Sequence, residues 1–105
     1  MSGTIALSDE VRWSAAGWLF DWTVEFLADN VTNERAAAQL REIVGENLGW
    51  LGLDDYGPEA GAEMRDVLRH QLLSAATERL PQTVPDRPAA IGHLQDLVGK
   101  AMAVS

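Results

Sequence analysis

Two histidines are the chain's candidates for metal ligation, and an aspartate lies close to each of them in the sequence. Asp66 precedes His70 by four residues and His93 precedes Asp96 by three, so each pair shares one face if its segment is helical. Two such helices packed antiparallel could bring four ligands together. However, the chain contains neither Glu-x-x-His nor His-Glu-x-x-His, the spacings typical of helical metal sites. We therefore predict hydrogen bonds or ion pairs for these residues, and no metal or other cofactor.

The serines and glycines show no spacing that is typical of catalysis. Ser8, Ser14 and Ser74 lie outside any Gly-x-Ser-x-Gly motif, and the chain has no cysteine. Three glycines between positions 45 and 52 follow a predicted helix, without the strand and the Lys-Ser/Thr pair of a phosphate-binding loop. We predict no catalytic residue, and we expect a binding protein rather than an enzyme.

Acidic residues dominate the charge of the chain, which carries a net charge of -8 from 16 acidic and 8 basic residues. Residues 1–57 hold ten acids and three bases, whereas residues 58–105 hold six acids and five bases. This charge disfavours nucleic-acid binding and favours attraction to a basic protein partner. The alternative is an acidic face that only keeps the chain soluble. The candidate partner-binding residues are Asp21, Glu25, Asp29, Glu42, Glu46, Asp54 and Asp55.

Aromatic residues gather in the first half of the chain, where residues 9–29 read as one helix with an unusually broad apolar surface. One interpretation is a central helix that the rest of the fold covers on most sides. The other is that one side of this helix faces a second copy or a different partner, because exposed aromatic clusters mark interfaces. The residues that could form a dimer surface or line a ligand pocket are Trp13, Phe20, Trp18, Trp22 and Trp50.

Capping residues and apolar periodicity predict four helices, over about 9–29, 33–48, 58–80 and 88–103. Ser8 and Thr32 are expected to cap the first two helices, and Pro58 to open the third. Residues 50–57 read as an apolar loop, and Thr4–Leu7 could form a short extended arm. We expect a single all-α domain over residues 1–105, a compact four-helix bundle with a long, largely buried first helix.

The function that these features favour is protein binding in the cytoplasm. The N-terminus lacks the pattern of a secretory signal, and Arg12, Asp21 and Glu25 interrupt the most apolar stretch, so no membrane association is expected. We expect a regulator, an antitoxin or an immunity-type inhibitor that engages a basic partner through its acidic N-terminal half. The alternatives are a ligand-binding or enzymatic bundle with a tryptophan-lined pocket, and a homodimeric scaffold.

Overall fold

The computed structural model describes residues 2–104, and it contains a sheet that the sequence analysis did not predict. Three strands, β1 (Ser2–Ala6), β2 (Arg12–Ala16) and β3 (Trp50–Gly52), lie in the order β2-β1-β3. The helices are α1 (Gly17–Asn30), α2 (Glu34–Gly45), α3 (Gly57–His70), α4 (Leu72–Arg79) and α5 (Arg87–Ala103), with a 3-10 helix, η1 (Leu53–Tyr56), before α3. The fold is therefore mixed α/β, and the predicted all-α four-helix bundle is wrong.

A β-hairpin takes the place of the first half of the predicted helix over 9–29. Ser8, which was expected to cap that helix, accepts hydrogen bonds from the amides of Glu10 and Val11 in the hairpin turn, at 3.4 and 3.1 Å. Serine makes the same local bond in a turn as at a helix start. β1 pairs antiparallel with β2. Ile5 lies opposite Trp13 in this pairing, and both side chains are completely buried. Burial of these paired side chains outweighs the helical preference of the segment.

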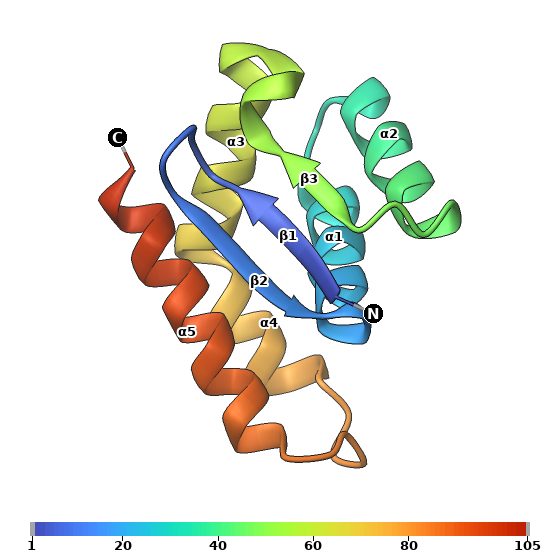
Figure 1. Cartoon of the computed structure of the whole chain (residues 1–105), viewed down its shortest axis with the longest axis vertical. Coiled ribbons are helices and arrows are strands. Elements are labelled where there is room, and N and C mark those ends of the chain that lie inside the picture. Colours follow the sequence, from blue (N-terminus) through green and yellow to red (C-terminus); the bar gives the residue numbers. More distant parts are fainter. Residues whose placement is uncertain (1, 105) are drawn as a thin grey trace.

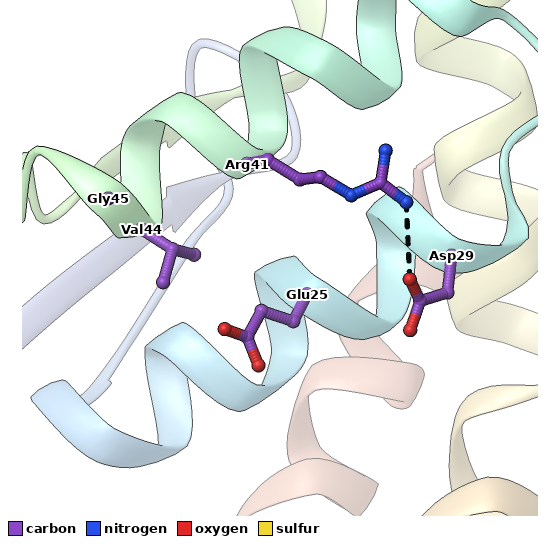
Figure 2. Close-up of a pocket in the computed structure, with 5 residues that line it drawn as sticks. All are labelled: Glu25, Asp29, Arg41, Val44 and Gly45. Carbon is purple, nitrogen blue, oxygen red and sulfur yellow. Dashed lines mark hydrogen bonds and ion pairs between the residues drawn. The ribbon is translucent and has the colours of Figure 1, made fainter.

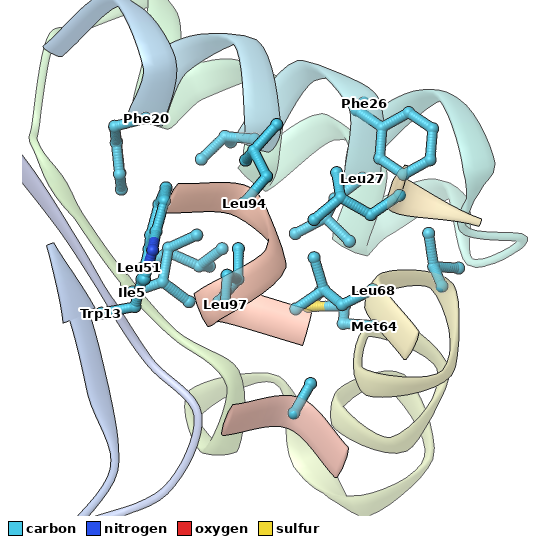
Figure 3. Packing of buried hydrophobic residues seen from close by; sticks show 14 of the residues in the cluster. Ile5, Trp13, Phe20, Phe26, Leu27, Leu51, Met64, Leu68, Leu94 and Leu97 are labelled. Atoms are coloured by element: carbon cyan, nitrogen blue, oxygen red, sulfur yellow. The ribbon is translucent and has the colours of Figure 1, made fainter. Parts of the chain in front are cut away.

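The sheet and the helices form two layers (Figure 1). β1 is the central strand, antiparallel to β2 and parallel to β3. Figure 3 shows Ile5, Trp13 and Leu51, one from each strand, facing Leu94 and Leu97 of α5. The core therefore lies between the inner face of the sheet and the helices.

Helix α5 closes the outer edge of β2. Lys100 Nζ donates to the carbonyl of Arg12 at 2.9 Å, and His93 Nε2 bonds the carbonyl of Ser14 at 2.6 Å. Because a carbonyl can only accept, Nε2 carries the hydrogen. The indole of Trp13 in turn donates to the His93 carbonyl at 3.0 Å, with the two rings 4.9 Å apart. These bonds occupy carbonyls that an open edge strand would offer to another chain.

Side-chain caps start two of the remaining helices, and a break at one residue separates two others. Asn33, rather than Thr32, caps α2, because its side chain accepts the amide of Ala36 at 3.0 Å. The helix predicted over 58–80 is divided at Gln71 into α3 and α4. Asp86 caps α5 through the amide of Ala89 at 3.4 Å. The predicted loop over 50–57 contains β3 and η1.

Candidate functional site

One side of α1 is turned away from the core and carries both aromatic and acidic side chains. The buried side of the helix includes Leu19, Phe20, Val24 and Leu27, which leaves the opposite stripe at the surface. We call this stripe the outer face of α1, and it consists of Trp18, Asp21, Trp22, Glu25 and Asp29. At about 100° per residue, these positions fall on one side of a helix.

The two tryptophans of the outer face differ in exposure. Trp18 is 45% exposed. Trp22, one turn later, is half-buried and stacks almost parallel on the ring of Phe26, with the ring centroids 5.9 Å apart. An exposed indole beside an indole that is stacked on a neighbouring ring is a typical composition of a binding surface. Tryptophan contributes a large apolar area at low cost in side-chain entropy.

A groove of about 400 Å³ lies between α1 and α2, next to the outer face. Glu25 and Asp29 line it from α1, and Arg41, Val44 and Gly45 line it from α2 (Figure 2). Arg41 bridges the two helices, because its guanidinium pairs with the Asp29 carboxylate at 3.3 Å and reaches the carbonyl of Ala28 at 3.5 Å. Within residues 2–104, Glu25 has no hydrogen-bond or ion-pair partner, so its charge is free for an incoming cation.

The remaining acids of the predicted surface lie elsewhere and do not join those of α1. Asp54 pairs with Arg65 at 3.4 Å. Burial raises the pKa of Tyr56 above its ordinary value, and the nearby carboxylates of Asp55 and Glu42 raise it further. Glu46 is exposed just after α2. Asp21, Glu25 and Asp29 thus form a patch on α1, whereas Asp55 and Glu42 lie near Tyr56.

The predicted aromatic cluster is dispersed by the fold. Trp13 and Phe20 are 0% and 1% exposed, so both belong to the core of one chain and neither faces a dimer partner. Trp50 stands at the surface, where the guanidinium of Arg12 lies 5.3 Å from its ring centre. Trp50 also lines a small hollow with Arg12, Asp54 and Asp55. Because Trp13 and Phe20 are buried, they do not form an open surface together with Trp50.

Groups that could bind a metal ion do not converge in the part of the chain that the structure describes. His70 is exposed on α3, whereas His93 is engaged with the edge of β2. Ser14 bonds the hydroxyl of Thr4 across the strands at 2.8 Å. Over residues 2–104, no three histidine or carboxylate side chains are placed to hold a metal ion.

Sequence reasoning identified the acids of the groove and missed its other wall. The spacing of Glu25 and Asp29 puts them on one helix face, which the sequence shows directly. Arg41, Val44 and Gly45 join them only because α2 packs back on α1. The apolar periodicity that predicts the second helix does not reveal which helix α2 contacts.

The chain matches no family model, no curated protein and no solved structure. The helices of residues 2–104 are all too short or too polar to span a bilayer.

Proposed function

We propose that this protein is a binding module that engages a basic protein partner through the outer face of α1 and the adjoining groove. The observation that carries the proposal is the combination on one helix face of an exposed tryptophan with three carboxylates. Aromatic side chains supply contact area, and uncompensated negative charge selects a partner of positive charge. We place this interaction in the cytoplasm, because a chain without cysteine needs no oxidising compartment.

The charge of the outer face supports a basic partner. Asp21, Glu25 and Asp29 follow one another at intervals of four residues, a spacing at which like charges destabilise a helix by a few tenths of a kcal/mol per pair. Arg41 is the one cation of residues 2–104 that forms an ion pair with any of the three. Positive charges from a partner would relieve this repulsion and speed the encounter.

The test uses a synthetic peptide with lysine and arginine on two sides of an apolar stripe, and the same peptide with glutamate in place of each basic residue. We expect the basic peptide alone to bind, with an affinity that falls as salt rises. Replacing the three charges of the outer face, Asp21→Asn, Glu25→Gln and Asp29→Asn, removes interactions of up to about 1 kcal/mol each. The affinity should then fall by about tenfold.

The control removes the same charge from elsewhere on the protein. Glu34→Gln, Glu59→Gln and Glu78→Gln together change three exposed acids outside the outer face. If binding depends on this face, the control triple variant retains an affinity close to that of the parent protein. Equal losses in the two triple variants would show that only net charge matters, and the proposal would be abandoned.

A further inference from the structure

We infer that the segment recognised by this surface is a basic amphipathic α-helix, which lies along the outer face of α1 and inserts one basic side chain into the α1–α2 groove. The inference rests on the proposed function and adds the conformation of the partner and its position. Both follow from the shape of the surface and from the hydrogen bonds that the surface can offer.

The outer face is a straight ridge on which two indoles lie among three carboxylates. Trp18 and Asp29 are eleven positions apart, which is about 16 Å at 1.5 Å per residue. Around the helix axis the order is Asp21, Glu25, Trp18, Asp29 and Trp22, so carboxylates and indoles are interspersed across the face. A partner helix with apolar residues at i, i+4 and i+7 and with basic residues next to them matches this arrangement.

Backbone hydrogen bonding favours a helix over an extended segment. The side of α1 offers no free main-chain groups, because a helix satisfies them internally. An extended segment buried against it would lose its bonds to water without replacing them, whereas a helix brings its own.

Strand addition to the sheet is not an equivalent alternative. The β2 edge already has its Arg12 and Ser14 carbonyls bonded to Lys100 and His93. At the other edge, β3 has only three residues, Trp50–Gly52, so it offers few main-chain groups for pairing.

The groove has the composition of a receptor for one lysine or arginine side chain. Val44 provides an apolar wall for the aliphatic stem, and the unpaired carboxylate of Glu25 provides a partner for the charged end. Figure 2 shows Val44 and Glu25 on facing walls of this space. Gly45 keeps the groove open, because it carries no side chain and nothing lies within 4 Å of the place where a Cβ would stand.

Gly45 therefore provides a steric test that leaves the charges unchanged. In Gly45→Phe, the added Cβ meets no atom of the fold within 4 Å, and the bulky side chain stands at the groove that Gly45 lines. Gly99→Phe is the matched control, because Gly99 is also an exposed helical glycine with open space around it, on α5. We expect Gly45→Phe to weaken binding of the basic amphipathic peptide about tenfold and Gly99→Phe to leave it unchanged. Equal affinities for the two variants would overturn the assignment of the groove.

A second pair of peptides tests the helical conformation. One has a proline at its first residue, and the other has the same composition with the proline moved to the centre, where it breaks a helix. We expect the first to gain helical circular dichroism when mixed with the protein and to bind at least tenfold more tightly. The central-proline peptide could bind the parent protein as tightly as the first peptide, and bind the triple variant at Asp21, Glu25 and Asp29 more weakly than the parent. That result would refute the helical conformation of the partner and leave the proposed function standing.

Two further outcomes would overturn the inference. If neither peptide distinguishes the parent from the variant lacking Asp21, Glu25 and Asp29, the proposed function itself fails. If sedimentation shows that the protein self-associates, and that Gly45→Phe but not Gly99→Phe abolishes this, the surface belongs to a second copy of the chain.

Discussion

Replacing Trp13 tests the central feature of the fold, the packing of the N-terminal hairpin on α5. Trp13 is completely buried, donates its indole N–H to the His93 carbonyl at 3.0 Å, and stacks on the His93 ring. Trp13→Phe keeps an aromatic ring and removes this donor. The lost hydrogen bond contributes about 1 kcal/mol, and leaving a partly buried carbonyl without its partner adds about as much again. We expect the free energy of unfolding to fall by about 2 kcal/mol.

Trp13→Ala adds the loss of the ring itself, for which truncation of a buried tryptophan predicts a cost of about 4 kcal/mol. Urea denaturation followed by far-ultraviolet circular dichroism measures both effects independently of tryptophan fluorescence. For a domain of this size, the Phe variant should melt roughly 8 °C below the parent.

Trp18→Phe provides the control, because Trp18 is 45% exposed and its replacement should change stability by less than about 0.5 kcal/mol. A Trp13→Phe variant as stable as the Trp18→Phe control would refute the packing of the hairpin on α5. It would favour instead a continuous helix in which position 13 is at the surface.

Three other changes have expected outcomes. The pKa of Tyr56 is raised above 10.0, so its neutral form contributes stability that is complete below pH 10 and is lost as pH rises through the folded-state pKa. In urea titrations, Tyr56→Phe should therefore lose less stability than the parent between pH 9 and 11. Parallel losses in the two proteins would contradict this. Arg69 donates to the Ala101 carbonyl at 2.8 Å. Arg69→Ala should therefore lower the free energy of unfolding by about 1–2 kcal/mol and speed amide exchange at the end of α5. Unchanged exchange there would contradict a stabilising role for this hydrogen bond. Gly57 has φ of 86°, so Gly57→Ala should destabilise the protein by about 1 kcal/mol. Gly99 is in an open helical position, so Gly99→Ala should raise the thermal midpoint, because alanine is the better helix former. A stabilised Gly57→Ala and a destabilised Gly99→Ala would refute both assignments.

The elements that the sequence predicted well are those whose signals are local. Asp86 and the apolar stripe that follows it indicate the last helix, and α5 occupies Arg87–Ala103. Pro58 stands at the start of α3, where its missing N–H costs nothing. The acidic stripe from Asp21 to Asp29 was also predictable, because its members lie on one helix and need no other element to bring them together.

The error over residues 9–29 has a specific physical cause. Trp13 and Ala15 are buried while Arg12, Ser14 and Ala16 are exposed, a strand alternation. Small residues at positions 14–16 also fit a helix, so the alternation is not visible in the sequence. What selects the strand is the pairing of β2 with β1 and the contacts of Trp13 with His93, eighty residues further along the chain. A local pattern contains no information on contacts at that separation.

The sequence by itself determines the charge of this protein, the positions of most of its helices and the face of α1 on which its acids lie, because all of these depend on composition or on neighbours within one or two turns. Tertiary structure alone decides that the chain contains a sheet and that Trp13 and Phe20 are core residues. It also decides that Arg41, Val44 and Gly45 complete a groove with Glu25 and Asp29. These features arise where distant segments exclude water from one another, and that burial outweighs the local preference of any single segment.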